Sequence, residues 1–367
     1  MCVRRATCDV RSACYVRCTF GVLPVGAYNR KVLTETSQGL YCPDGDFFID
    51  PWQPVPRALI THAHGDHARP GSAAYLCTPG TAALLRRRLG ADTSIQTVAY
   101  GERITLGSAA ISFHSAGHVL GSAQIRIEGS AGVWVAAGDY KRAADPTCAP
   151  FEPVRCDTFI TESTFGLPIY RWDDTAAIMR DIFGWWDGNR EAQKCSVIFC
   201  YTLGKAQHLL AELARLTDRT VFVHGMMLGM IEAYREAGVD LPEVKPVIEK
   251  TEKTSRARKT SFAGELVLAP LSARGTPWMR RLGAISDAFA SGLMRVRGVR
   301  RQRAYDRGFV ISDHADWPGL LHTIHETGAS RVLATHGYAE LLARHLQSLG
   351  LESGTIRTAW EGEGAGD

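Results

Sequence analysis

The sequence predicts an α/β protein in which one α/β unit is inserted into another. Short strands in the first part of the chain each end in a histidine, aspartate or glutamate, as expected when a site is assembled at one rim of packed sheets. From about residue 170 buried strands alternate with amphipathic helices, and the first pattern resumes near residue 308. We therefore expect four segments: an N-terminal extension (1–32), an outer domain (33–170), an inserted domain (171–306) and the return of the outer domain (307–367).

Composition sets the broad class. The chain has 367 residues, which is enough for two domains, and its 45% hydrophobic and 22% charged residues are ordinary for a globular protein. No apolar stretch approaches the roughly 20 residues needed to span a bilayer, so no membrane association is expected. The formal charge is only +4, so any affinity for nucleic acid must come from local clustering.

The extension holds four of the ten cysteines, and no secretory apolar segment precedes them. We expect a poorly ordered segment and a reducing, cytoplasmic compartment rather than a disulfide framework. A metal site is the weaker alternative, because the spacings match no familiar zinc pair. The four residues are Cys2, Cys8, Cys14 and Cys18.

The expected elements follow hydrophobic periodicity and turn residues. In the outer domain we predict strands at 46–50, 58–60, 74–77, 103–106, 109–114, 123–128, 132–136 and 158–161, with a helix at 81–89. In the inserted domain we predict helices at 176–186, 205–216, 226–237 and 278–290, strands at 196–200, 221–223 and 266–268, and a charged loop at 249–259. The return contains strands at 308–312 and 331–334, helices at 317–327 and 339–349, and a frayed tail from 361.

The heptapeptide at 61–67, Thr-His-Ala-His-Gly-Asp-His, is the densest chemical signal in the chain. An apolar run at 58–60 leads into it, and the segment 68–72 breaks regular structure after it. Imidazole and carboxylate without thiolate are the ligands of a catalytic zinc site rather than of a structural one. A polar turn that merely contains histidines is the alternative, but three of twelve histidines fall within six positions. We therefore predict a metal site.

Further acids and histidines at strand ends supply enough ligands for two zinc ions, with Mn²⁺ as an alternative in one or both sites. Metals sharing a carboxylate can clamp a phosphodiester and activate a water. Asp50 is expected to hold an imidazole N–H and fix its tautomer. The natural partition gives His62, His64 and His118 to one metal, Asp66, His67 and His336 to the other, and Asp139 to both.

Two strand-end residues are not needed for coordination. Glu162 and His314 could form a hydrogen-bonded pair in which the carboxylate favours the charged imidazole, and such a pair is a good general acid. We expect His314 to protonate the leaving alkoxide. Catalysis is thus assigned to Asp66, His314 and Glu162.

Substrate contacts are harder to predict. The densest basic cluster contains Arg295, Arg297, Arg300, Arg301, Arg303 and Arg307. It is either a solvated face or, because it leads directly into the His314 strand, a phosphate-binding surface. Further candidates for phosphate contacts are Tyr201, Lys205, Ser272, Arg274 and Thr276.

These motifs resemble those of a known group. The segment 61–67 carries the His-x-His-x-Asp-His signature of the metallo-β-lactamase fold, and Asp50, His118 and Asp139 match its other metal motifs. The resemblance implies an αββα sandwich. Glu162, the Ser-Asp-His-Ala-Asp segment at 312–316 and His336 resemble the three extra motifs of the β-CASP nucleases, in which a second α/β unit is inserted into the lactamase fold and caps the cleft.

Five segments are similar to the bacterial ligase-associated DNA exonucleases, namely 39–43, 50–52, 201–205, 294–298 and 314–317, and the similarity runs from about residue 33 to 360. It implies a cytoplasmic nuclease of bacterial DNA repair that works at the nucleoid. Its substrate would be DNA, single-stranded or with a free end. An ATP-dependent DNA ligase and a helicase encoded nearby are the implied partners.

Three other functions stay open at this stage. A histidine at position 336 is shared with the RNA-processing β-CASP branches, so a ribonuclease is the main alternative, and a contact to the 2′-OH would discriminate it. A small-molecule metallo-hydrolase needs neither an inserted domain nor Glu162 and His314. A catalytically silent nucleic-acid-binding module is disfavoured by the complete ligand set.

Overall fold

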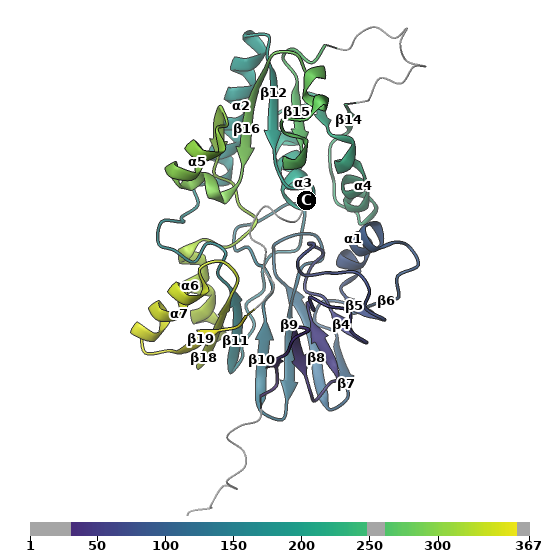
Figure 1. Cartoon of the computed structure of the whole chain (residues 1–367), viewed down its shortest axis with the longest axis vertical. Helices are drawn as coiled ribbons and strands as arrows, with labels where there is room; N and C mark the ends of the chain where they lie inside the picture. The colour runs from purple at the N-terminus through teal and green to yellow at the C-terminus, as the bar shows by residue number, and fades with distance from the viewer. Residues whose placement is uncertain (1–30, 248–260, 358–367) are drawn as a thin grey trace, which may run out of the picture.

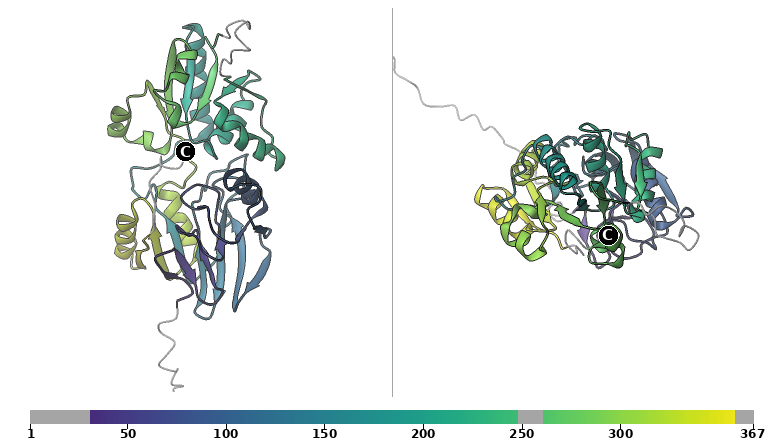
Figure 2. Two further views of the ribbon diagram at one scale, coloured as in Figure 1. Left: turned by 45° about the vertical axis from the view of Figure 1, so that its right-hand side comes forward. Right: turned by 90° about the horizontal axis from the view of Figure 1, so that it is seen from above.

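The computed structural model describes residues 31–247 and 261–357, which form a mixed α/β fold built on three sheets. Two sheets occupy one half of the elongated molecule and the third occupies the other half (Figure 1; Figure 2). Most of the predicted extension, the charged stretch at 249–259 and the tail from 361 lie outside the described residues. Among the described helices, none has the length and hydropathy needed to cross a membrane.

The first two sheets form a sandwich. The first sheet runs in the order β1 (Thr34–Glu35), β2 (Leu40–Cys42), β3 (Phe47–Ile49), β4 (Ala58–Leu59), β5 (Tyr75–Cys77), β6 (Ile95–Thr97). The second runs in the order β19 (Glu352–Thr355), β18 (Arg331–Thr335), β11 (Thr158–Glu162), β10 (Gly132–Ala136), β9 (Ala123–Gly129), β8 (Ala109–Ser115), β7 (Arg103–Leu106). Phe47 and Leu59 of the first sheet share one buried core with Phe113 and Ile125 of the second. This burial removes a large apolar area from water and holds the two sheets together.

Two helices cover the outer face of the second sheet, at the lower left of Figure 1. They are α6 (Trp317–Thr327) and α7 (Ala339–Ser348). Leu320 and Leu342 of these helices pack with Phe159 and Val332 of the sheet. Asp316 caps α6 by accepting a hydrogen bond from the Gly319 amide, so this helix begins directly after the predicted catalytic segment.

The third sheet is parallel throughout, with the order β14 (Val244–Pro246), β13 (Val221–Val223), β15 (Leu266–Ala269), β12 (Cys195–Phe199), β16 (Ile285–Ala290), β17 (Arg307–Phe309). Helix α2 (Thr175–Glu191) leads into this sheet, and the connections between its strands carry α3 (Lys205–Ala214), α4 (Leu228–Glu236) and the short α5 (Arg297–Arg303). The βα rhythm predicted for this region is therefore confirmed. A parallel sheet needs helical crossovers, which explains the alternation in the sequence.

The two halves are joined by a shared core. Ile60, which follows β4, belongs to the same buried cluster as Ile198 of β12 and Ile231 of α4. Helix α1 (Pro79–Leu89) also contributes to this cluster and lies against α4 (Figure 1). The loop that carries His62 is thus enclosed by packed residues of both halves.

The predicted helix at 278–290 is wrong. A short 3₁₀ segment (Pro277–Arg281) is followed by Gly283 at φ +77°, and the chain then enters the strand β16. β16 is hydrogen-bonded on both sides, to β12 and β17, and is almost entirely buried. Its sequence, Ile-Ser-Asp-Ala-Phe-Ala, lacks the apolar–polar alternation of a half-buried strand, and periodicity alone does not separate a strand that is buried on both faces from a helix.

The strand predicted at 308–312 lies instead at Arg307–Phe309, where it forms β17. β17 pairs in parallel with β16 and therefore belongs to the third sheet, not to the sandwich. The chain leaves the third sheet after Phe309, and residues 310–312 then lead to the site without regular secondary structure.

Candidate metal centre

The predicted ligands are gathered where strands of the sandwich end. β4 leads to His62, β8 leads to His118, β10 leads to Asp139 and β18 leads directly to His336. α1 fixes the loop after β4, because Nη1 of Arg88 donates to the carbonyls of residues 63 and 68, at 2.7 and 3.3 Å. The sequence does not reveal this role of Arg88, since nothing in the spacing of the residue shows which carbonyls its side chain reaches.

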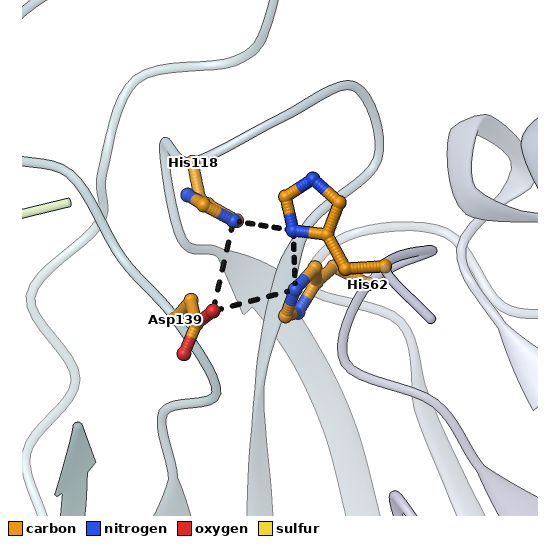
Figure 3. Close-up of side chains that lie close together, drawn as sticks. His62, His118 and Asp139 are labelled. Carbon is orange, nitrogen blue, oxygen red and sulfur yellow. Dashed lines mark hydrogen bonds and ion pairs between the residues drawn. The ribbon is translucent and has the colours of Figure 1, made fainter. Parts of the chain in front are cut away.

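The first group contains His62, His64, His118 and Asp139, whose ligating atoms lie within 4.8 Å of one another. His64 Nδ1 is 3.1 Å from both His62 Nε2 and His118 Nε2. Figure 3 shows the labelled His62, His118 and Asp139 pointing toward one another, with Asp139 Oδ2 at 3.5 Å from His62 Nε2 and 3.8 Å from His118 Nε2. Donors held at about 2.0–2.2 Å from one tetrahedral zinc lie about 3.3–3.5 Å apart, so these separations fit a shared cation.

Hydrogen bonds on the far side of the rings fix the tautomers of two of these histidines. His64 Nε2 lies 3.2 Å from the Leu203 carbonyl and His118 Nδ1 lies 2.8 Å from the Asp313 carbonyl. A carbonyl only accepts, so both of these nitrogens carry the hydrogen. The inward nitrogens, His64 Nδ1 and His118 Nε2, therefore present lone pairs when the rings are neutral.

The third histidine follows the same logic. The Thr61 hydroxyl donates to Asp50 Oδ2 at 2.5 Å, so it accepts from His62 Nδ1, which lies 3.1 Å away. His62 Nε2 is then also unprotonated and faces inward. Three lone pairs and a carboxylate converge on one point, an arrangement that is repulsive unless a cation lies among them.

Protonation would not relieve that repulsion at neutral pH. Burial lowers the pKa of His62 well below its usual range, and the neighbouring His67 lowers it further. Burial likewise lowers the pKa of both His64 and His118. The three rings are therefore neutral, which is the form that binds a metal.

The second group contains His67, Asp139 and His336. Asp139 Oδ2 lies 3.5 Å from His67 Nε2, and Asp139 Oδ1 lies 3.5 Å from His336 Nδ1. Asp66 Oδ2 is 3.8 Å from His67 Nε2. Asp66, His67 and His336 line the same pocket together with Asp50, which accepts a hydrogen bond from His67 Nδ1 at 2.8 Å, as predicted for a residue that fixes a tautomer. Asp139 thus faces both groups.

Charge balance in the second group also points to a cation. Burial would lower the pKa of His67, but Asp139 and Asp66 outweigh burial and raise it well above its usual range. Burial would raise the pKa of Asp139, but His67 and His314 hold it well below its usual range. Within the described chain, His67 Nε2 and Asp139 Oδ1 are buried atoms that make no hydrogen bond of normal geometry. A divalent ion at this place would displace the proton and satisfy both atoms.

The turn that presents His336 is strained. His336 has φ +60°, which is rare for a residue with a side chain, and Gly337 follows at φ +52°. A Cβ on Gly337 would lie 2.4 Å from the Ser163 carbonyl oxygen. The Ser163 hydroxyl lies 2.9 and 2.5 Å from the carbonyls of Thr335 and His336 and stabilises the turn. Strain of this kind is typical of functional sites.

Glu162 and His314 form the predicted pair. His314 Nδ1 lies 3.0 and 2.9 Å from the two carboxylate oxygens of Glu162, and both residues are buried. The Tyr140 amide donates to Glu162 Oε1 at 2.8 Å, and Trp172 Nε1 donates to the His314 carbonyl at 2.9 Å, so each partner is held in place. His314 Nδ1 is 4.0 Å from Asp139 Oδ2, beside the shared carboxylate.

One predicted substrate contact, Lys205, is wrong, and a second, Arg274, has partners within the fold. Lys205 is fully buried and its ammonium lies 3.0 Å from Asp313 Oδ2, so it cannot reach a bound nucleic acid. The Arg274 guanidinium donates to Asp287 and to the carbonyls of residues 303 and 304, at 2.7–3.0 Å, and lies 3.8 Å from the Tyr305 ring centre. Lys205 therefore stabilises the fold instead, whereas 32% of the Arg274 side chain is exposed.

The other predicted contacts differ in exposure. Ser272 and Arg297 are exposed, Tyr201 is half-buried, and Thr276 is half-buried with its hydroxyl donating to the Ala273 carbonyl at 2.7 Å. Arg295 pairs with Asp173 at 3.0 Å. Both residues belong to the third-sheet unit, by which we mean the third sheet with the helices and loops around it. The Arg300 side chain lies outside the part of the chain that the structure describes.

The fold and site define a mixed α/β protein with clustered histidine and aspartate groups that can bind metal. No family model matches the chain. It is 32% identical over 326 residues to a protein named "Probable DNA ligase" from Opitutus terrae, an alignment that covers 87% of this chain but 30% of that protein. The chain therefore spans less than a third of that relative.

Two further relatives share a shorter segment. Both are named "Endoribonuclease ysh1". The protein from Aspergillus fumigatus is 36% identical over 121 residues, and the protein from Emericella nidulans is 36% identical over 122 residues. These alignments cover 32% of this chain and 13% of each relative. Among solved structures, a protein of unknown function from Enterococcus faecalis V583 has the same overall fold, with a TM-score of 0.55, 11% identity and coverage of 84% of this chain and 80% of that one.

Proposed function

We propose that this chain is a two-metal phosphodiesterase of the metallo-β-lactamase fold with an inserted β-CASP unit, and that it removes nucleotides from DNA ends. One observation carries the proposal: Asp139 faces both metal-binding groups, and the His314–Glu162 pair lies directly beside it. A nuclease needs these three parts together, because it must bind the phosphodiester, activate water and protonate the leaving group.

The residues fit two divalent cations, zinc first and Mn²⁺ as the alternative. His62, His64 and His118 would hold one ion, Asp66, His67 and His336 the other, and Asp139 would contact both. When bound, such ions supply Lewis-acid stabilisation of the phosphoryl oxygens and lower the pKa of a water molecule. Asp50 and Thr61 orient the rings of the two groups through their hydrogen bonds.

His314 would be the general acid. Its Nδ1 faces both oxygens of Glu162, so the hydrogen on Nδ1 is held there, and a transferable proton must reside on Nε2. The carboxylate favours the charged ring and keeps it oriented for transfer. The leaving alkoxide of a nucleic acid is a strong base and needs such a proton.

DNA is favoured over RNA by the extent of similarity. The relative named as a DNA ligase aligns with most of this chain, whereas the endoribonucleases align with about a third of it. The first relative also supports an association with a DNA ligase. The endoribonucleases support the second candidate, an RNA-cleaving enzyme with the same chemistry. The proposed backbone contacts remain Tyr201, Ser272, Arg274, Thr276 and the arginines of the cluster at 295–307.

The test uses single-stranded DNA and RNA oligonucleotides of one sequence, each labelled at either end. Each is incubated with zinc- or manganese-loaded protein and with an Asp66→Ala, His67→Ala control. We expect a ladder on DNA that the control abolishes, and the label that yields it sets the polarity. Degradation of RNA alone would support the ribonuclease, and activity on neither substrate would overturn the proposal.

A further inference from the structure

A second cluster of charges is buried behind the first metal-binding group. It contains Lys141, Asp145, Lys205, His208 and Asp313, and we call it the buried charge cluster; each member is at most 9% exposed. Lysine and aspartate are seldom buried this completely, because taking each charge out of water is costly unless it is paired. The cluster balances two ammonium groups with two carboxylates.

The cluster joins segments that are far apart in the sequence. Lys141 Nζ is 2.8 Å from both Asp145 Oδ2 and His208 Nδ1, which links the sandwich to α3. Lys205, one helical turn before His208, lies 3.0 Å from Asp313 Oδ2 and donates to the Ile311 carbonyl at 3.1 Å. One face of α3 therefore holds the segment that leads to His314.

The segment 311–313 also positions His118, one of the candidate metal ligands. The carbonyl of Asp313, whose side chain pairs with Lys205, accepts the hydrogen of His118 Nδ1 at 2.8 Å. That bond fixes which nitrogen of His118 faces the metal-binding group. The start of α3 contributes a second such bond, because the Leu203 carbonyl orients His64 at 3.2 Å. Two of the three histidines of the first group thus depend on backbone carbonyls beside Lys205.

The placement of Lys205 is otherwise unfavourable. Its ammonium is fully buried in the first turn of a helix, where the peptide dipoles disfavour positive charge. An apolar side chain would avoid both costs if filling space were sufficient. The ammonium instead fixes two groups of the 311–313 segment at once, the Asp313 carboxylate and the Ile311 carbonyl.

We propose that Lys205 is a positioning residue for the first metal-binding group: by pairing with Asp313 it holds the carbonyl that orients His118. This rests on the two-metal site proposed above. Lys205 itself touches neither substrate nor metal. Removing its charge should therefore weaken metal binding at the first group and leave the second group unchanged.

The test separates the two groups. A His336→Ala background retains the first group, and a His62→Ala background retains the second. Lys205→Met is introduced into each background in the full chain, and Zn²⁺ affinity is measured by competition with a chromophoric chelator. In the first background we expect the Kd for Zn²⁺ to rise about 10–100-fold, and in the second to change less than about twofold. Lys205→Arg, which keeps the charge, should recover most of the loss.

Two controls test whether a change in Zn²⁺ affinity comes from the Lys205–Asp313 pair rather than from a general loss of stability. Arg219→Met removes the ion pair with Asp187, which is in the third-sheet unit and takes no part in the site, so it should leave both affinities unchanged. Lys205→Met alone leaves the Asp313 carboxylate buried without its partner. If that variant does not fold, the double variant Lys205→Met, Asp313→Asn replaces it, because both charges are then removed. Circular dichroism and thermal unfolding establish that each variant is folded.

The outcomes are distinct. Selective weakening in the first background, rescued by arginine, supports the positioning role. Equal losses in both backgrounds, or no loss in either, would overturn it. If the parent chain binds no Zn²⁺ at all, the proposed function fails, which is a different result from an unaltered affinity in the Lys205→Met variant.

Discussion

His314 and Glu162 lie side by side although 152 positions separate them in the sequence, with His314 Nδ1 at 3.0 and 2.9 Å from the two carboxylate oxygens. The carboxylate comes from the end of β11 and the imidazole from the segment that returns from the third sheet. The chain must therefore return from the third sheet to bring the imidazole beside the metal-binding groups.

The first prediction concerns this pair. His314→Ala should lower DNA cleavage about 10²–10⁴-fold, since the leaving alkoxide then lacks a proton donor. A nitrophenyl phosphodiester should be hydrolysed nearly as fast as by the parent protein, because nitrophenolate leaves without protonation. Steady-state rates on both substrates check this. Equal losses on the two substrates would exclude a general-acid role.

The second prediction concerns the exposed arginines of α5. Replacing Arg297 and Arg301 by glutamine should weaken binding of single-stranded DNA and reduce the slope of log K against log salt by about 1.4, or about 0.7 for each lost phosphate contact. Fluorescence anisotropy at several salt concentrations measures the slope. Arg103→Gln with Arg344→Gln removes the same net charge from β7 and α7 and should leave it unchanged. An unchanged slope in both pairs would mean that the α5 arginines are only a solvated face.

The third prediction concerns the strained turn after β18. Gly337→Ala should destabilise the chain by at least about 1–3 kcal/mol, because alanine is strained at φ +52° and its Cβ would lie 2.4 Å from the Ser163 carbonyl. Gly184→Ala in α2 is the matched control: no atom lies within 4 Å of the added Cβ, so it should stabilise by about 0.5–1 kcal/mol. Urea unfolding gives both values. Similar effects for both glycines would contradict the strain.

The fourth prediction concerns acid stability. Burial would raise the pKa of Asp145, but His208 and Lys141 outweigh burial and hold it well below the usual range. A carboxyl whose pKa is depressed by folding stabilises the protein above its unfolded pKa of about 3.9, and this contribution is lost as the pH falls below that value. Asp145→Asn should therefore destabilise the chain at pH 7, and the difference from the parent should shrink toward pH 2.5.

Urea midpoints at the two pH values check this prediction. The exposed Asp92→Asn should show little difference from the parent at either pH. A difference for Asp145→Asn that is the same at pH 7 and pH 2.5 would show that the loss comes from packing rather than from the ionised carboxylate.

The sequence could predict which histidines and aspartates come together, because each of them follows the end of a short strand. The loop after β4 and the residues after β8, β10 and β18 follow this rule. It could not predict Arg88, the Leu203 carbonyl or the Lys205–Asp313 pair, because these contacts depend on how α1 and α3 pack across the two halves.

The errors have physical causes of their own. Lys205 is a basic residue of a kind that usually remains solvated, yet its ammonium is fully buried and pairs with the Asp313 carboxylate. β16 was predicted as a helix because an interior strand of a parallel sheet is buried on both faces and lacks the alternation that marks other strands.

In the proposed two-metal site, one cation lies on each side of the Asp139 carboxylate. Anomalous diffraction at the zinc edge, from crystals grown with Zn²⁺, tests it most directly. We predict two anomalous peaks in each chain, one among His62, His64 and His118 and the other among Asp66, His67 and His336. One peak alone, or peaks away from Asp139, would contradict the two-metal site.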